Sequence, residues 1–245
     1  MATLGSDELD FGGVLDHARN VGGPALRAMT FAERGEMLKA LSGAIHEHRD
    51  ELLELSAANA GTTRKDGKFD VDGATGTMAA YAYFARELGD RRVISDGPGI
   101  QLGRTARFWG QHIYTPRLGA AVHINAFNFP AWNMMEKAAC ALLAGVPVIE
   151  KPGLATSLVA WRIAQISIES GLLPEGSFQC ISARVGDLLE RLGRQDAMAF
   201  TGSARTGAML KGYDNLIKNN VRVNIEADSL NAAVLAPDVE EGTET

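Results

Sequence analysis

The sequence predicts an α/β protein with a mostly parallel β-sheet covered by helices on both faces. Three observations indicate this class. Strand-like and helix-like segments alternate regularly after Arg117. The strand-like segments are short and almost wholly apolar, which is typical of parallel strands buried on both faces. The residues before about 90 have helical rather than strand periodicity.

The helical region comes first and spans residues 1–90. Thr30-Phe31-Ala32-Glu33 forms a capping box, and apolar residues at helical spacing follow at Met37, Leu38, Leu41 and Ile45. A second helix contains Leu52, Leu53 and Leu55. Residues 61–63 and 65–67 break the pattern, so a third helix is expected near Val71–Leu88.

Residues 91–117 have a different character, with apolar side chains scattered among Gly, Pro and Arg. This pattern favours extended strands or a hairpin. From residue 118 to 245 the alternation predicts six strands, at Ala120–Asn125, Val146–Glu150, Ser177–Ser182, Ala197–Thr201, Val221–Ile225 and Ala232–Leu235. Between the first five of these, helical segments are expected at about 130–143, 155–170, 184–193 and 204–218.

Composition excludes several classes of protein. The 245 residues carry a net charge of −6, which argues against a nucleic-acid partner. No apolar run is long enough to span a bilayer and no signal peptide is visible, so we expect a cytoplasmic protein without a membrane partner. Two cysteines exclude a disulfide framework and most metal clusters, and no metal site is expected.

Ligands of parallel α/β sheets bind beyond the carboxyl ends of the strands, where two candidate residues follow the first two strands. Asn128 precedes Pro130, which suits a helix start, and its amide could donate to a developing oxyanion. The alternative is that Asn128 only caps the helix. Lys151 could bind phosphate or ribose hydroxyls, or it could be a solvated surface lysine.

The fourth and fifth strands end in two further candidates. Thr201-Gly202-Ser203 closes one strand and opens a helix, an arrangement that binds anions through free backbone amides or simply caps the helix. Glu226 lies between Ile225 and Ala227, so partial desolvation would raise its pKa toward that of a general base. The alternative for Glu226 is an exposed carboxylate at a strand end.

Taken in order, these elements resemble the aldehyde dehydrogenase superfamily. The matching stretches are Asn125–Pro130, Val148–Pro152, Phe200–Gly207 and Asn224–Asp228, joined by the turn Gly171–Gly176. The residues of Ile124–Pro130 and Glu226–Asn231 resemble those of the branch of this family that oxidises semialdehydes of CoA thioesters in phenylacetate and benzoate catabolism. The resemblance implies a Rossmann-like dinucleotide-binding part over 118–245, with 1–90 as its helical portion and 91–117 as a candidate oligomerisation segment.

The resemblance also implies site roles. Asn128 would hold the oxyanion of the thiohemiacetal, and Glu226 would activate the water that hydrolyses the thioester intermediate. Lys151 would contact the adenosine ribose of NAD or NADP, with Phe127 lining the nicotinamide pocket. The phosphates of the cofactor would lie against Gly202 and Ser203, and the hairpin would join subunits of a homo-oligomer.

The sequence departs from many family members in its cofactor and substrate regions. Where many NAD-using members carry an acid that binds the ribose 2′-hydroxyl, this chain has Leu154, and Thr156 and Ser157 nearby are expected to offer hydroxyls to a 2′-phosphate. NADP is therefore the expected preference, with NAD as the alternative. Where the family's helix often presents an aromatic side chain to the substrate, this chain has Asn133 and Glu136, which would suit a polar or extended substrate. The alternative is that Trp132 and Met135 simply pack in the core.

The family nucleophile is a cysteine beyond the glutamate, in a catalytic domain that this chain is expected to lack. Cys140 and Cys180 lie in a helical run and a strand, so both are expected to be small buried hydrophobes. We therefore expect a cofactor-binding portion of an aldehyde dehydrogenase, inactive alone. The alternatives are a catalytically inactive nucleotide-binding or subunit-interaction module, and a different Rossmann-type dehydrogenase, which the lack of a Gly-x-Gly-x-x-Gly motif disfavours.

Overall fold

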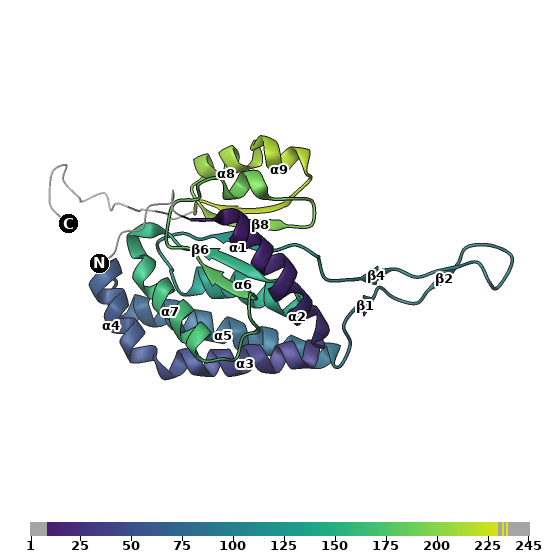
Figure 1. The fold of residues 1–245 in the computed structure, drawn as a ribbon. Helices are drawn as coiled ribbons and strands as arrows, with labels where there is room; N and C mark the ends of the chain where they lie inside the picture. Colours follow the sequence, from purple (N-terminus) through teal and green to yellow (C-terminus); the bar gives the residue numbers. More distant parts are fainter. Residues whose placement is uncertain (1–8, 230–231, 233, 235–245) are drawn as a thin grey trace.

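The computed structural model describes residues 9–229, 232 and 234 and contains a five-stranded parallel sheet. Its strands lie in the order β7-β6-β5-β8-β9 (Figure 1). They are β5 (Ala121–Ile124), β6 (Val148–Lys151), β7 (Phe178–Cys180), β8 (Ala197–Gly202) and β9 (Arg222–Ala227). All four residues of the central strand β5 are buried. The predicted α/β class and parallel sheet are confirmed.

Long helices cover one face of the sheet: α3 (Phe31–Glu47), α4 (Arg49–Ala60), α5 (Arg64–Leu88), α6 (Trp132–Leu143) and α7 (Ser157–Glu169) (Figure 1). The predicted capping box starts α3, because Thr30 Oγ1 accepts from the Glu33 amide at 3.2 Å and the Glu33 carboxylate accepts from the Thr30 amide at 2.7 Å. Among the described helices, none is long and apolar enough to cross a membrane.

The opposite face is covered by the N-terminal helices and by the elements around β8. A continuous rod of α1 (Phe11–His17), the π-helical turn η2 (Ala18–Gly22) and α2 (Gly23–Ala28) crosses the sheet (Figure 1). The 3₁₀ turn η4 (Leu188–Arg191), α8 (Ala204–Lys211) and α9 (Asp214–Lys218) complete this layer. Arg19 fixes the rod through an ion pair with the buried Asp196, whose carboxylate also accepts from the amides of Ala120 and Gly193 at 2.8 and 2.7 Å.

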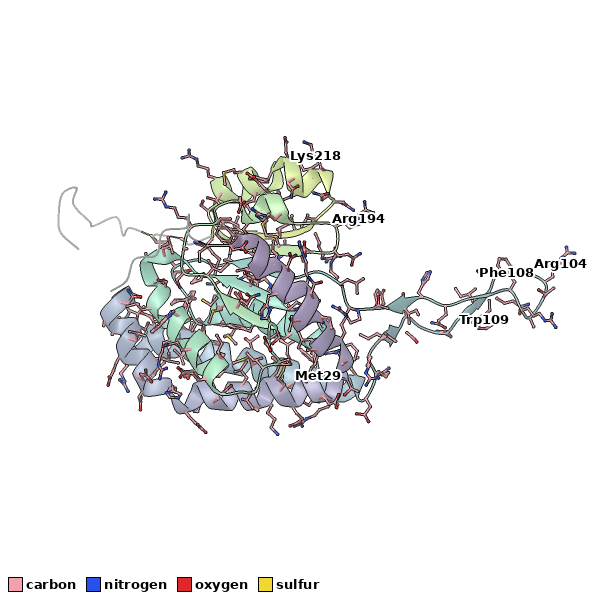
Figure 2. All side chains as sticks on the ribbon, in the orientation of Figure 1. Met29, Arg104, Phe108, Trp109, Arg194 and Lys218 are labelled. Carbon is pink, nitrogen blue, oxygen red and sulfur yellow. The ribbon has the colours of Figure 1, made fainter. Side chains whose placement is uncertain are left out.

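Residues 91–117 form the predicted hairpin, which projects away from the body (Figure 1). It consists of two antiparallel pairs, β1 (Ile94–Ser95) with β4 (Ile113–Tyr114) and β2 (Ile100–Gln101) with β3 (Trp109–Gly110). Its far end carries Arg104, Phe108 and Trp109, well away from the sheet (Figure 2). The apolar side chains exposed along it include Ile100, Leu102, Phe108, Trp109, Ile113 and Tyr114.

Three predicted helices differ from the observed ones. Helix α5 begins at Arg64 rather than near Val71, because the Thr63 side chain caps it by accepting from the Asp66 amide, and the helix continues through the buried Gly67. The segment expected to be helical at 184–193 contains only the short turn η4, and the segment 204–218 divides into α8 and α9. The strand expected at Ala232–Leu235 includes residues 233 and 235, which lie outside the described residues.

Candidate functional site

The carboxyl ends of β5, β6, β8 and β9 form one edge of the sheet, and the predicted site residues lie there. The parallel register places Ile124 beside both Lys151 and Phe200, and Thr201 beside Glu226. The backbone N–H of Asn125 extends the hydrogen bonding between β5 and β6 by donating to the Lys151 carbonyl at 3.0 Å. Parallel pairing therefore gathers residues that are up to about a hundred positions apart in the sequence.

The loop after β5 is packed tightly against the loop after β6. A Cβ atom added to Gly153 would lie 2.9 Å from the Cα atom of Phe127, so only glycine fits there without a shift. Thr156, at the end of the 3₁₀ turn η3 (Leu154–Thr156), is buried and donates its hydroxyl to the Phe127 carbonyl at 2.5 Å. The expectation that Thr156 offers its hydroxyl to a 2′-phosphate is therefore wrong, since the protein itself uses that hydroxyl.

Phe127 and Asn128 both face outward from this loop. The Phe127 side chain is 63% exposed, and Asn128 is also exposed. An apolar ring held out on a packed backbone can offer a flat surface to a ligand. The alternative that Asn128 caps α6 is not realised, because the carboxylate of Asp70 accepts from the amides of Ala131 and Trp132 at the start of that helix.

Lys151 ends β6 with its ammonium group half-buried. The Nζ atom donates to the Pro152 carbonyl at 3.1 Å, and burial lowers the pKa of the ammonium below its ordinary value. A partly desolvated cation that contacts one neutral carbonyl can still donate to other acceptors. Lys151 is therefore suited to bind a hydroxyl or phosphate, and it is not the fully solvated surface lysine of the alternative interpretation.

A buried polar group lies beneath this edge, and the sequence interpretation missed it. The Glu150 carboxylate is fully buried and accepts from the Asn125 side-chain amide at 2.8 Å, with His123 Nδ1 at 2.6 Å from its other oxygen. Burial, and secondarily Glu150, raises the pKa of Cys180 to about 12. Among the described residues, no three or more His, Cys, Asp or Glu side chains are placed so that they could hold a metal ion together.

The β8 and β9 side of the edge carries the remaining predicted residues. Ser203 caps α8 by accepting from the Thr206 amide at 3.3 Å. Next to it, Asp228, in the left-handed conformation with φ of 58°, accepts from the Ala204 amide at 2.9 Å. The protein's own carboxylate thus already contacts the helix N-terminus that the sequence marks as an anion site.

Glu226 is exposed, 3.4 Å from the Thr201 hydroxyl. Its predicted desolvation is not observed, because β9 lies at the sheet edge and leaves this side chain open to solvent.

The predicted substrate-facing residues on α6 are corrected in part. Asn133 is buried at 7% exposure, so it cannot line an open surface, whereas Glu136 is half-buried and pairs with Lys137 at 3.2 Å. Met135 is buried in the core as the alternative expected. Cys140 is exposed on α6 rather than buried, and Cys180 is half-buried.

Comparison with known proteins agrees with this arrangement. The model of the aldehyde dehydrogenase family matches residues 5–242, which is nearly the whole chain. The chain belongs to the aldehyde dehydrogenase family. The family fold is also present in solved structures: an NADP-dependent enzyme of E. coli superposes with a TM-score of 0.78 at 26% identity, over 94% of this chain and 45% of that one. A lactaldehyde dehydrogenase superposes with a TM-score of 0.76 at 25% identity, over 89% and 44%.

Two aldehyde dehydrogenases are similar to this chain in amino-acid sequence. A 3,4-dehydroadipyl-CoA semialdehyde dehydrogenase from Aromatoleum evansii is 43% identical over 99% of this chain and 47% of its own length. A betaine aldehyde dehydrogenase from Vibrio vulnificus (strain CMCP6) is 33% identical over 82% of this chain and 40% of its own length. The chain spans about half the length of the curated relatives that it matches.

Proposed function

We propose that this chain is the cofactor-binding portion of an aldehyde dehydrogenase that oxidises a CoA-linked semialdehyde to the corresponding acid during aromatic-acid degradation. The observation that carries the proposal is the 43% identity, over 99% of the chain, to a relative named for a CoA semialdehyde. The exposed Asn128 and Glu226 at the carboxyl edge are consistent with roles toward a substrate. The acid product and the CoA-linked substrate are both part of the proposal.

In this proposal the chain contributes two groups to the chemistry. The Asn128 amide donates to the oxyanion that forms when a thiol adds to the aldehyde, which stabilises developing negative charge. Glu226 accepts a proton from the water that hydrolyses the thioester, and its exposed carboxylate leaves room for that water. The bound cofactor supplies the hydride acceptor. The proposal assigns the thiol to a catalytic domain outside this portion, so that neither Cys140 nor Cys180 takes the role of nucleophile.

The residues at the edge fit a dinucleotide. Lys151 would donate to the adenosine ribose, the outward ring of Phe127 would line the nicotinamide pocket, and Gly202 and Ser203 would approach the phosphates. We propose NADP as the preferred cofactor and NAD as the alternative. Leu154 supports this preference, because it is exposed and brings no carboxylate to repel a 2′-phosphate. With Thr156 engaged, Ser157 is the hydroxyl that remains for that phosphate.

We further propose a cytoplasmic homo-oligomer joined through residues 91–117. This hairpin carries exposed apolar side chains and contains five arginines and one aspartate in a chain of net charge −6. A cationic, apolar projection on an acidic protein is complementary to a second acidic copy. Residues 1–90 and 118–245 then form one cofactor-binding unit from which this projection extends.

Cofactor binding by the purified chain tests the proposal without requiring turnover. We expect NADP to bind more tightly than NAD in titration calorimetry, and Lys151→Ala to weaken binding of either cofactor by about tenfold, as loss of a charge-assisted hydrogen bond predicts. Lys39→Ala, an exposed lysine on α3, is the matched control. Tighter NAD binding would refute the preference, and unchanged affinity in Lys151→Ala would refute the assigned site.

Leu154→Glu tests the proposed preference for NADP over NAD at the residue on which it rests. The added carboxylate should favour NAD over NADP, because it accepts from the 2′-hydroxyl and repels the 2′-phosphate. An aldehyde dehydrogenase assay on the chain extended by the remaining half of the enzyme then separates an active dehydrogenase from an inactive nucleotide-binding or subunit-interaction module. Absence of oxidation with any CoA-linked semialdehyde would favour the module.

A further inference from the structure

The start of helix α6 depends on a side chain from another helix. The backbone amides of the first residues of a helix have no partner within it, and the N-cap residue Ala131 has no side-chain acceptor. Asp70 on α5 takes this role: its carboxylate accepts from the Ala131 amide at 3.1 Å and from the Trp132 amide at 2.7 Å. Asp70 is 2% exposed, so this carboxylate is directed into the protein and not toward solvent.

Neighbouring residues of α5 reinforce the same contact. The Phe69 ring packs edge-on against Phe129 and Trp132, with ring centroids 5.8 and 5.0 Å apart. The indole of Trp132 also donates to the Thr77 hydroxyl at 3.1 Å, and any Cβ on Gly73 would collide with the indole ring. We call this set of contacts between α5 and residues 129–132 the α5–α6 clasp.

The clasp restrains Asn128 through a short and stiff connection. Only Phe129 and Pro130 separate Asn128 from the first clasped amide. The proline ring fixes φ of Pro130, and the residue before a proline has a restricted backbone. Phe129 is further held by its contact with Phe69. Rotation of the Asn128 backbone is therefore limited on its carboxyl side, as it is limited on its amino side by the bond from Thr156 to Phe127.

A buried carboxylate at the start of a helix costs free energy, because burial disfavours its charged form. Burial raises the pKa of Asp70 to about 6, against the opposing effect of the two amides that it accepts from. A serine or threonine at the N-cap position would satisfy amides of α6 without burying a charge. The additional property that Asp70 provides is a fixed distance and direction between α5 and the segment that carries Asn128.

We propose that Asp70 is a positioning residue that holds Asn128 in place for the oxyanion, acting through the amides of Ala131 and Trp132. This inference rests on the proposed function for the role of Asn128, while the restraint itself rests only on the contacts above. Ordering of a hydrogen-bond donor before reaction is what makes such a donor effective.

Nuclear magnetic resonance on the 245-residue chain tests the restraint. Asp70→Asn keeps one acceptor and Asp70→Leu keeps none, so we expect amide exchange at Ala131 and Trp132 to accelerate about tenfold in the first variant and further in the second. The side-chain NH₂ group of Asn128 should lose order in Asp70→Asn and lose more in Asp70→Leu. Exchange in β5 should stay within about twofold, and Glu87→Gln on the exposed face of α5 is the charge-matched control.

Each outcome decides the inference. An unchanged order of the Asn128 side chain in both variants would show that Asp70 only caps α6, and equal acceleration in β5 would show a role in global stability; either result overturns the proposal. In the chain extended by its catalytic half, Asp70→Asn should lower kcat about tenfold with little change in the KM for cofactor. If the unsubstituted enzyme oxidises no aldehyde, the proposed function fails while the resonance measurements still decide the restraint.

Discussion

The buried carboxyl of Asp70 predicts a specific pH dependence of stability. Its pKa rises from an ordinary 3.8 to about 6 in the folded chain, chiefly because burial disfavours the charged form. The folded state therefore binds a proton at Asp70 more tightly than the unfolded state does. The stabilisation that results is fully present below pH 3.8 and is lost as the pH rises through about 6.

The magnitude follows from the two pKa values. One pKa unit corresponds to about 1.4 kcal/mol, so the full contribution is about 3 kcal/mol. Between pH 7.5 and pH 5, proton linkage gives roughly half of this amount, about 1–2 kcal/mol. Asn at position 70 in Asp70→Asn cannot titrate, so on lowering the pH over this range the free energy of unfolding of the unsubstituted chain should rise by about 1–2 kcal/mol relative to the variant.

Urea denaturation of both chains at the two pH values measures this difference, and contributions from all other titrating groups cancel between the chains. Glu87→Gln serves as the control and should give no pH-dependent difference, because Glu87 is exposed. Parallel pH dependence of the unsubstituted chain and Asp70→Asn would refute the reasoning, since it would mean that Asp70 titrates alike in the folded and unfolded states.

Three further substitutions have expected outcomes. Asp196→Ala leaves the buried Ala120 amide, the half-buried Gly193 amide and the Arg19 guanidinium without their acceptor, so the free energy of unfolding in urea should fall by about 3–5 kcal/mol. A loss below about 1 kcal/mol, which is the value of a surface ion pair, would contradict the contacts. Gly153→Ala forces apart the loops that meet at Phe127 and should cost about 1–3 kcal/mol, whereas Gly43→Ala, with open space around it, should cost nothing in the same assay. Asp228→Asn removes a negative charge from the start of α8, so the Kd for NADP at low salt should fall about two- to fivefold, and a rise would contradict the phosphate assignment.

Local sequence patterns were sufficient to predict the sheet and its candidate edge. The predicted strands ending at Glu150, Thr201 and Ile225 are directly followed by Lys151, Gly202 and Glu226, and parallel pairing brings these three residues to one edge. The capping box at Thr30 is equally local, since both of its hydrogen bonds join residues three apart. Features determined by neighbours in sequence can be predicted without the fold.

Features determined by residues far apart in the sequence could not be predicted in this way. Thr156 was expected to face a cofactor, but its hydroxyl is bonded to a residue 29 positions away. Asp228 lies 24 positions from the amide that it accepts from. Gly67 was expected to break a helix, yet it is buried inside α5, where an added Cβ atom would lie 3.3 Å from Leu53 of α4. In each case tertiary contact outweighs the local preference of the residue.

The segment from Asn125 to Trp132 shows why the local motif is not sufficient for the site. Its amino end is tied by Glu150 on β6, its middle by Thr156, and its carboxyl end by Asp70 on α5. These three side chains lie outside the segment, and all three are buried. A chain with the same segment but without these contacts would keep the amide of Asn128 and lose its direction. In the role proposed for Asn128, the donor must already be oriented toward the oxyanion, so the distant carboxylates are as much a part of the proposed site as the motif itself.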